Sequence, residues 1–310
     1  MVSNLRILHI GDVAGVPQTL AKEQRECGDI SHILSFENHP YAYGVDFHHT
    51  RNGKWPFDYL VKLGTFSKYA AKYDVLHFHY GSLLPKGADT LLWRSLSKKV
   101  IIHHHGSELR DVGEKLIYLR TADRIFVSTP DLLEWSSTAE WIPNPISLQD
   151  FPFTCVTNLD ESKPLLIVHS PSNRAVKGTS IIEHSIDDLK KEGYNVKLLI
   201  VEGVKHSHAI ELYKQADIAI DQLLIGWYGM FAVECMALGK PVCCFIRDDL
   251  IDRIPKETIQ DVTTNNLTDS LRELIVDRNL RQKLGVNGRH YVEKRHDSKI
   301  IARQVMKSYY

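Results

Sequence analysis

The segment 165–179 reads LLIVHSPSNRAVKGT, and the fold class can be worked out from it. It begins with a short continuous apolar run, which is typical of a strand buried on both faces of a parallel sheet. A polar turn follows, and residues 178–191 are then compatible with a helix. A strand, a turn and a helix in this order predict one βα unit of a doubly wound α/β sheet.

Similar units extend from this segment in both directions. Toward the C-terminus we predict strands at 196–201, 218–220 and 242–246 and helices at 208–216 and 230–238. Toward the N-terminus we predict strands at 5–10, 30–36, 75–78, 100–102 and 125–127 and helices at 58–72 and 87–97. The pattern stops near Pro143 and resumes at Pro164, which indicates a hinge at 146–163 between two doubly wound, Rossmann-like domains.

We therefore expect an N-terminal domain at 1–155, a second domain at 156–290 and a C-terminal helix at 291–310. The last segment carries an amphipathic strip formed by Ile300, Ile301, Val305 and Met306. We expect this helix to cross back and pack toward the N-terminal domain. A length of 310 residues fits two domains of about 150 residues each.

The composition is that of an ordinary globular chain. Hydrophobic residues make up 43% and charged residues 25%, and 38 Lys and Arg balance 38 Asp and Glu. This balance offers no basic excess for nucleic-acid binding, so we expect no nucleic-acid partner. Five cysteines without a C-x-x-C pair indicate a reducing compartment, and we expect a cytoplasmic protein.

Doubly wound sheets bind ligands at the carboxyl ends of their strands, so the loops there carry the candidate functional residues. After the first strand, Gly11 and Gly15 precede Pro17, which suits a first helical turn. Such a loop presents backbone N–H groups to an anion, although an ordinary tight turn is the alternative. The chain contains no G-x-G triplet, which argues against a nicotinamide or flavin dehydrogenase.

Histidines follow two strands of the first half, at His77 and His79 and at 103–105. His77 and His79 share one face of a strand and could chelate a metal ion. Neither an H-E-x-x-H motif nor a Cys/His spacing supplies further ligands, so we favour an interpretation without a metal. A histidine at the end of a strand can still point into a cleft and act there.

Two loops of the second half suit a nucleotide. Arg174 and Lys177 lie just before a predicted helix N-terminus, where cations and N–H groups favour a phosphate or diphosphate. A solvated basic turn is the alternative. Further on, Gly229 opens a helix that contains Glu234, whose oxygens can accept the hydroxyl protons of a ribose. A buried structural glutamate is the alternative there.

Taken together, these segments resemble glycosyltransferase family 4, whose members are retaining enzymes with the GT-B fold. The resemblance rests on Arg174-Ala-Val-Lys177-Gly-Thr and on Phe231-Ala-Val-Glu234-Cys-Met-Ala-Leu-Gly-Lys-Pro-Val, with Ala216-Asp-Ile ahead of the second motif. The first half has counterparts in the same order, in segments that begin at Asp74, Val100, Ala122 and Trp141. The match covers nearly the whole chain and implies two Rossmann-like domains that face a cleft.

The resemblance also implies a function. It implies transfer of a hexosyl group from a nucleotide-diphosphate sugar to a glycan or lipid-linked acceptor, with retention, in polysaccharide or glycolipid assembly. It implies that the N-terminal domain takes the acceptor and the second domain the donor. The implied catalytic residues are His105, Arg174 and Lys177, and the implied donor contacts are Gly11, Gly15, Arg174, Lys177, Gly229, Met230, Phe231 and Glu234. His105 would lie beside the reacting sugar, the two cations would hold the diphosphate, and Glu234 would hold the ribose.

We expect neither a metal nor a cofactor, because the family needs no divalent metal and the chain has no D-x-D triplet to hold one. One position departs from the family pattern: the donor loop usually carries two glutamates, and the first falls at Gly226. Two alternatives therefore stay open, a non-hydrolysing sugar-nucleotide epimerase and a catalytically weak nucleotide-sugar-binding protein.

An aromatic and basic cluster of Trp93, Arg94, Lys98 and Lys99 also suggests a peripheral contact with the inner face of the membrane. A solvated helix end is the alternative explanation for this cluster.

Overall fold

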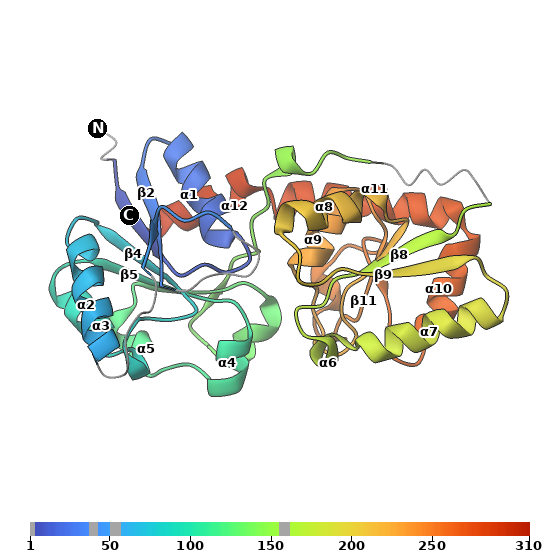
Figure 1. Ribbon diagram of the computed structural model, residues 1–310. Helices are drawn as coiled ribbons and strands as arrows, with labels where there is room; N and C mark the ends of the chain where they lie inside the picture. The colour runs from blue at the N-terminus through green and yellow to red at the C-terminus, as the bar shows by residue number, and fades with distance from the viewer. Residues whose placement is uncertain (1–3, 37–42, 50–56, 155–161) are drawn as a thin grey trace. The chain divides into compact units, whose positions relative to one another are not determined.

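The structure, a computed structural model, describes residues 4–36, 43–49, 57–154 and 162–310 (Figure 1). The chain divides into two compact units. The first unit comprises Met1–Pro145 and Ser298–Tyr310, and the second unit comprises Ile146–Asp297. Each unit is built on one parallel sheet flanked by helices, so the α/β class and the two doubly wound sheets are confirmed.

The sheet of the first unit has the strand order β3-β2-β1-β4-β5-β6-β7. Its strands are β1 Arg6–Ile10, β2 Ile30–Ser35, β3 Phe47–His48, β4 Val75–His79, β5 Lys99–His104, β6 Arg124–Val127 and β7 Glu140–Trp141. The strands β2 and β3 extend the sheet on one side of β1, and β4 to β7 extend it on the other side. The strand order therefore reverses between β1 and β4, and ligands of doubly wound sheets bind at such a switch point.

Helices cover both faces of this sheet because its strands are apolar on both faces. The helices α2 (Phe57–Ala70), α3 (Asp89–Ser95) and α5 (Tyr118–Thr121) supply Phe66, Trp93 and Tyr118 to one core. The helices α1 (Val16–Glu26) and α12 (Ser298–Lys307) supply Leu20 and Val305 to the core on the other face. The short helix α4 spans Ser107–Val112.

The C-terminal helix α12 packs beside α1 (Figure 1). Ile301 and Val305 are buried there, whereas Ile300, which we placed on the same strip, is 43% exposed. Tyr309 completes the buried face, and its hydroxyl lies 2.7 Å from His77 Nδ1. The buried face follows the four-residue spacing from Ile301 to Val305 to Tyr309, and this spacing leaves Ile300 on the outside.

The sheet of the second unit has the strand order β12-β11-β10-β8-β9. Its strands are β8 Leu165–His169, β9 Val196–Ile200, β10 Ile218–Ile220, β11 Val242–Cys244 and β12 Gln260–Asp261. Its helices are α6 Arg174–Lys177, α7 Thr179–Lys191, α8 His206–Gln215, α9 Met230–Ala237, α10 Leu267–Val276 and α11 Arg278–Arg295. The switch point of this sheet lies between β8 and β10.

The division between the units differs from the boundaries that we predicted at residues 155 and 290. It falls at Pro145 and Asp297, because the backbone N–H of Ile146 donates to the carbonyl of His296 at 2.8 Å. The start of the predicted hinge at 146–163 packs on the second unit, where the carbonyl of Phe151 accepts a hydrogen bond from Arg289. Residues 155–161, which include the predicted boundary, lie outside the described residues.

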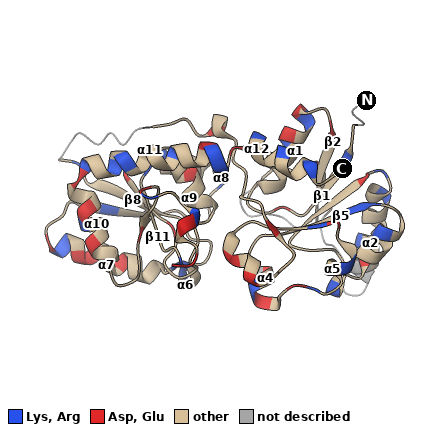
Figure 2. Ribbon diagram, turned by 180° about the vertical axis from the view of Figure 1, so that it is seen from behind, with Lys and Arg blue, Asp and Glu red and all other residues tan. Residues whose placement is uncertain are grey.

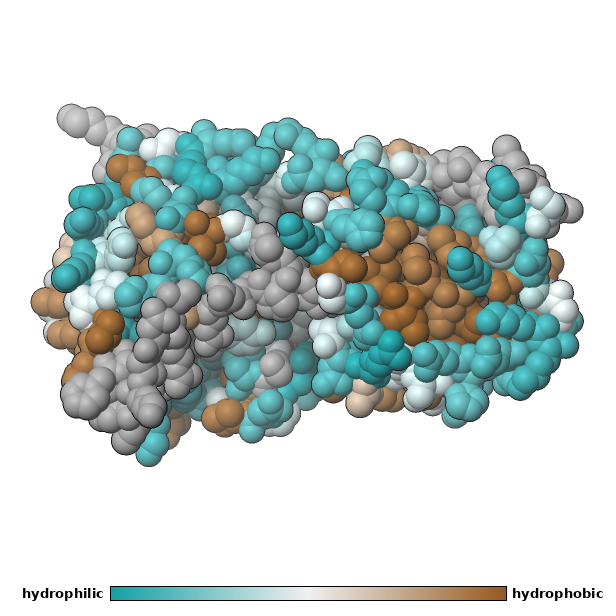
Figure 3. Space-filling model, in the orientation of Figure 1, coloured by the Kyte–Doolittle hydropathy of each residue, from teal (hydrophilic) through white to brown (hydrophobic). Residues whose placement is uncertain are grey.

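The surface is mixed in charge. Lys and Arg are interspersed with Asp and Glu over the helices of both units (Figure 2), in line with the overall balance of charges. An apolar area lies over β8 and β9 (Figure 3). Leu166 of β8 and Leu199 of β9 are only partly buried. Within the described ranges, no helix has the length and apolar character that crossing a bilayer requires.

The cluster that we predicted as a membrane contact is organised differently. Trp93 is 2% exposed and packs edge-on against Phe66, with ring centroids 4.9 Å apart. Arg94 pairs with Asp123, and Lys98 Nζ donates to two backbone carbonyls. The expectation of an exposed aromatic anchor at Trp93 is wrong, because this ring completes the core under α3.

Candidate functional site

The switch point of the second unit carries a buried ion pair. Lys177 is the last residue of α6, which follows β8, and Asp221 directly follows β10. Lys177 Nζ lies 2.7 Å from Asp221 Oδ1, and the two side chains are 12% and 0% exposed. The other carboxylate oxygen, Oδ2, accepts the backbone N–H of Gly229, the N-cap residue of α9, at 2.6 Å. The lysine cation and the start of α9 thus meet around one carboxylate.

The loop that leads to Gly229 is held by Gln222, whose side chain is completely buried. Gln222 Nε2 donates to the carbonyls of Trp227 and Phe245, and Oε1 accepts the backbone N–H of Ile225. Neither Gln222 nor Asp221 was predicted from the sequence to have a role. Two polar residues directly after an apolar strand, at the end where ligands bind, are the signal that could have found them.

Arg174 begins α6 and is engaged at the surface. Its side chain is 54% exposed, and its Nη2 lies 2.7 Å from Glu202 Oε2. The first turn of α6 is capped by the Asn173 side chain, which accepts the N–H groups of Ala175 and Val176. Arg174 is therefore a solvent-exposed cation paired with a glutamate, whereas Lys177 is a nearly buried cation paired with an aspartate.

Glu234 lies on α9 and points to α8. Its side chain is 7% exposed, and its Oε1 lies 2.6 Å from Nε2 of His206, the first residue of α8. Burial by itself lowers the pKa of His206, but the hydrogen bond and the charge of Glu234 outweigh it, so the pKa lies above its ordinary value of 6.5. His206 thus pairs with the glutamate that the resemblance implies as a ribose contact. The sequence did not point to His206, because it lies on a different helix.

The raised pKa of His206 predicts a pH-dependent contribution to stability. The stabilising pair with Glu234 is fully present below the unfolded-state pKa of 6.5 and is lost as the pH rises through the higher folded-state pKa. We expect His206→Gln to lower the free energy of unfolding more at about pH 6 than at about pH 9. Chemical denaturation of both proteins across this range measures the difference, with exposed His290→Gln as the control. A loss that does not change with pH would contradict the pairing.

Gly226 has no space for a side chain. Its φ is +94°, and a Cβ atom there would overlap Cγ of Arg247 and lie 2.7 Å from Cδ. The backbone N–H of Arg247 donates to the Gly226 carbonyl at 3.0 Å, and its guanidinium pairs with Asp249. The aliphatic stem of Arg247 thus lies where the side chain of the family's first glutamate would begin.

Met230 and Phe231 form the first turn of α9 after Gly229. Phe231 is 8% exposed and packs edge-on against Tyr213, with ring centroids 5.0 Å apart. Its side chain belongs to the core, and the backbone of this turn is what remains for a ligand contact. A Cβ atom at Gly229 would come 3.2 Å from Lys177 Nζ, so the glycine keeps the backbone close to that cation.

In the first unit, Gly11 and Gly15 lie in the loop after β1. Gly11 has a φ of +102°, and a Cβ atom there would lie 3.0 Å from the carbonyl oxygen of His79. Gly15 has a φ of 72° and caps α1, which has Pro17 in its first turn. Both positions require glycine. The N–H of Gly11 donates to the carbonyl of Leu34, so this amide already has a partner.

His105 follows β5 and uses both ring nitrogens inside the first unit. Nε2 lies 2.9 Å from His79 Nδ1, and Nδ1 lies 2.6 Å from Ser128 Oγ. Burial lowers the pKa of His105 to about 4, so the ring is neutral at pH 7. His105 is therefore part of a network of rings, which the resemblance does not describe.

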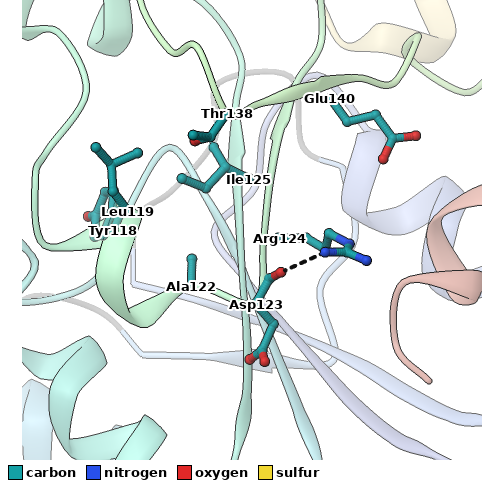
Figure 4. A pocket seen from close by; sticks show the side chains of 8 residues that line it. All are labelled: Tyr118, Leu119, Ala122, Asp123, Arg124, Ile125, Thr138 and Glu140. Carbon is teal, nitrogen blue, oxygen red and sulfur yellow. Dashed lines mark hydrogen bonds between the residues drawn. The ribbon is translucent and has the colours of Figure 1, made fainter.

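A shallow pocket of about 360 Å³ opens at the amino ends of β6 and β7 (Figure 4). Ile125, Arg124 and Glu140 line it, and Nη1 of Arg124 donates a hydrogen bond to the carbonyl of Asp123. Because this pocket lies at the edge of the sheet opposite the carboxyl-end loops, it takes no part in the candidate site.

No protein-family model and no curated protein sequence matches the chain. Solved structures do match. Sucrose-phosphate synthase from Thermosynechococcus elongatus is 19% identical, with a TM-score of 0.67 over 98% of both chains. The catalytic domain of starch synthase IV from Arabidopsis thaliana, bound to ADP and acarbose, is 14% identical, with a TM-score of 0.66 over 99% of both chains. An alpha-glucosyltransferase in complex with UDP and DNA is 13% identical, with a TM-score of 0.66 over 99% of this chain and 100% of that one.

These solved structures are GT-B glycosyltransferases, and the match extends over nearly the full length of each. The chain therefore has the GT-B fold, and this part of the sequence-based expectation is confirmed. Sequence identities this low establish the fold alone, so membership of glycosyltransferase family 4 stays a prediction.

Proposed function

We propose that the protein is a retaining glycosyltransferase that moves a hexosyl group from a nucleotide-diphosphate sugar to a glycan or lipid-linked acceptor. One observation carries this proposal: Lys177 Nζ and the N–H of Gly229 meet around one carboxylate at the switch point of the second unit. A cation and a helix start at the end of parallel strands suit a diphosphate. The GT-B fold supports the same conclusion.

Lys177 retains donor capacity for a phosphate. An ammonium group has three N–H donors, and among the described residues only Asp221 is seen to accept one of them. The buried carboxylate fixes the position of the ammonium. We propose that the remaining N–H groups bind the β-phosphate and stabilise its negative charge as the nucleoside diphosphate leaves.

Arg174 supplies the second cation by exchanging partners. Its pair with Glu202 is solvent-exposed, and exposed ion pairs contribute only about 0–1 kcal/mol. A diphosphate carries more charge than one carboxylate and binds the guanidinium fork with two hydrogen bonds. Arg174 is therefore free to leave Glu202 when the donor binds, at little cost to the fold.

Replacing Arg174 by alanine tests this role. Hydrogen bonds to a charged group contribute about 1.5–3 kcal/mol, so we expect Arg174→Ala to weaken donor binding roughly 10–100-fold and to leave thermal stability unchanged. Isothermal titration with a nucleotide sugar measures the affinity. The matched control is Arg272→Ala, which removes another exposed arginine that pairs with a glutamate, Glu192. Equal affinities for the two variants would contradict the assignment.

Glu234 is proposed to bind the ribose. Oε1 is bonded to His206, and a carboxylate has further lone pairs for the two hydroxyl protons of a ribose. This contact would increase the affinity for the donor and would take no part in the bond-breaking step. From the resemblance we also propose that the first unit takes the acceptor and that His105 lies beside the reacting sugar. The Gly11–Gly15 loop would close over the phosphates or admit the acceptor.

Front-face substitution fits this site better than a double displacement. A double displacement needs a free carboxylate as nucleophile. Asp221 is fully buried behind Lys177 and the N–H of Gly229, so its carboxylate does not face a bound sugar. The two cations carry the leaving-group charge without a divalent metal, so we expect turnover without added Mg²⁺ or Mn²⁺.

A second candidate function follows from Gly226. Because Arg247 fills the space beside it, no carboxylate reaches the sugar hydroxyls from this position. The contact between Gly226 and Arg247 therefore favours a second candidate, a nucleotide-sugar-binding protein with weak turnover.

Incubation with a panel of nucleotide sugars, without acceptor, separates these functions. Slow release of nucleoside diphosphate supports transfer, and tight binding without release supports the second candidate. An isomerised donor would identify a sugar-nucleotide epimerase instead. The absence of both binding and turnover with every donor would overturn the proposal.

We also propose an acceptor class and a location. A lipid-linked acceptor implies a cytoplasmic protein that touches the inner face of the membrane during polysaccharide assembly. With Trp93 buried, such a contact would rest on the exposed Leu91, Leu92 and Leu96 of α3 and its C-terminal end. Flotation with anionic vesicles tests this contact, and a protein that stays at the bottom of the gradient would contradict it.

A further inference from the structure

Five histidines gather at the carboxyl ends of three neighbouring strands in the first unit. They are His9 of β1, His77 and His79 of β4, His103 of β5 and His105 just after it. The register pairs His9 with His77 and His79 with His103. The first four side chains are at most 3% exposed, and His105 is partly exposed. The transfer function proposed above uses only one of them.

Three of these histidines have the geometry of a ligand set. Nitrogen atoms of His79, His103 and His105 all lie within 4.8 Å of one another. His79 Nδ1 and His105 Nε2 are 2.9 Å apart. His103 Nδ1 is buried and has no hydrogen-bond partner within the described part of the chain. A buried imidazole nitrogen without a partner indicates a missing water or ion.

The second ring nitrogen of each of these histidines is already oriented by the protein. His105 Nδ1 lies 2.6 Å and His103 Nε2 3.4 Å from Ser128 Oγ, which is itself placed to donate to the His104 carbonyl at 3.1 Å. With its proton on that carbonyl, Ser128 accepts an N–H from both rings. Ligating histidines almost always have such a partner on the other nitrogen.

The same holds for His79. Its Nε2 lies 3.0 Å from His9 Nδ1, and His9 Nε2 lies 2.9 Å from Gln24 Oε1. An amide oxygen only accepts, so His9 carries its proton on Nε2 and accepts on Nδ1 the N–H of His79 Nε2. The remaining nitrogen, His79 Nδ1, then has a lone pair. When His105 carries its proton on Nδ1, the lone pair of His105 Nε2 faces it, and a cation between them resolves the repulsion; when the proton is on Nε2, the 2.9 Å contact is a hydrogen bond that the cation has to displace.

We propose that His79 Nδ1, His103 Nδ1 and His105 Nε2 bind one transition-metal cation of the Zn²⁺ type. Three neutral imidazoles suit Zn²⁺, Co²⁺, Ni²⁺ or Cu²⁺ and not Mg²⁺ or Ca²⁺, which prefer oxygen. At a Zn–N distance of about 2.0–2.1 Å, tetrahedral ligand nitrogens are about 3.3 Å apart, so the pair of His79 and His105 needs to open by only a few tenths of an ångström. The partly exposed edge at His105 leaves the fourth position to water.

The neighbouring trio of His9, His77 and His79 also meets the distance criterion but suits an ion less well. The rings of His77 and His79 are stacked with an interplanar angle of 10°, so their in-plane lone pairs run parallel and do not converge. His77 Nδ1 is also occupied by the Tyr309 hydroxyl. In the trio that we assign, the rings are inclined more strongly, by 24°, 26° and 31°. The first two of these pairs are still stacked, so their rings have to turn toward one point when the ion binds.

The proposed ion ties the ends of β4 and β5 together and does not depend on the nucleotide-sugar proposal. It touches no residue assigned to the diphosphate. It does use His105, which the transfer proposal places beside the reacting sugar. Because metal binding is measured without donor or turnover, failure of the metal proposal and failure of the transfer proposal are distinguishable.

Titration of the metal-stripped full-length chain with Co²⁺ tests the site. We expect one Co²⁺ per chain, the intense visible bands of tetrahedral coordination, displacement by Zn²⁺ and a higher melting temperature. His103→Gln and the partly exposed His105→Gln should abolish the bands, whereas His77→Phe should keep them. Ser128→Ala, which removes the orienting hydroxyl, should weaken binding about 10–100-fold.

Circular dichroism and melting without metal establish that each variant is folded. If buried His103→Gln does not fold, His105→Gln decides the question. A folded wild-type chain that binds neither Co²⁺ nor Zn²⁺ overturns the proposal. Binding that survives in both His103→Gln and His105→Gln, or that is lost in His77→Phe, also overturns it.

Discussion

Replacement of Lys177 by methionine should abolish nucleotide-sugar binding and lower the free energy of unfolding by about 3–5 kcal/mol. Methionine keeps most of the aliphatic stem but removes the cation that faces Asp221 at 2.7 Å. The carboxylate of Asp221 is fully buried and would be left with one backbone N–H as its partner in the described structure. An uncompensated buried charge is the reason for the large loss.

A double variant separates the two consequences. In Lys177→Met/Asp221→Asn the buried charge is gone, and the amide oxygen still accepts the N–H of Gly229. We expect most of the stability to return while donor binding stays absent. Chemical denaturation and isothermal titration measure the two quantities, with Lys191→Met as the control for an exposed lysine that pairs with an aspartate.

Either of two results would count against this account. If the double variant is as unstable as the single one, the uncompensated charge is not the cause of the loss. If Lys177→Met binds nucleotide sugars as the wild type does, Lys177 does not contact the diphosphate.

The second large effect concerns Gly285 on α11. A Cβ atom at Gly285 would overlap the backbone carbonyl of Gly239, the glycine that ends α9 with a φ of +80°. Neither backbone can yield without separating the two helices. We expect Gly285→Ala to destabilise the second unit by about 1–3 kcal/mol or more, although alanine is favoured over glycine in a helix by about 1 kcal/mol.

Gly288 on the same helix provides a matched control. A Cβ atom there would lie 3.0 Å from Cγ of Met236, which is a flexible side chain that can move aside. Gly288→Ala should therefore change the free energy of unfolding much less than Gly285→Ala does, as measured by chemical denaturation. Equal effects of the two substitutions would show that backbone contact is not what makes Gly285 necessary.

Much of the fold could be predicted from the sequence. Strands such as Ile218–Ile220 and Val242–Cys244 are continuous apolar runs, and burial on both faces of a parallel sheet demands such runs. Three strands were missed: Phe47–His48, Glu140–Trp141 and Gln260–Asp261. Each has only two residues at the edge of a sheet, and two residues carry no periodicity.

The candidate site was predicted less completely. Lys177, Gly229 and Glu234 were selected from the sequence because cations, glycines and carboxylates follow predicted strands. Their partners Asp221 and His206 were not, because each comes from another element. The predicted surface position of Trp93 was wrong. An aromatic residue beside lysines is typical of a surface anchor, and the sequence does not show whether the ring points into the core.

The sequence by itself determined the order of strands and helices, the two doubly wound sheets and the loops at their carboxyl ends, because apolar periodicity and glycine placement are local properties. Only the tertiary structure decided which side chains meet. It paired Lys177 with Asp221 across 44 positions, placed Arg247 beside Gly226, and brought histidines of three strands into one cluster. The physical reason is that such contacts depend on the order of strands in a sheet. Local patterns do not specify that order, so, although both histidine groups were recognised in the sequence, the way in which their rings meet was not predicted.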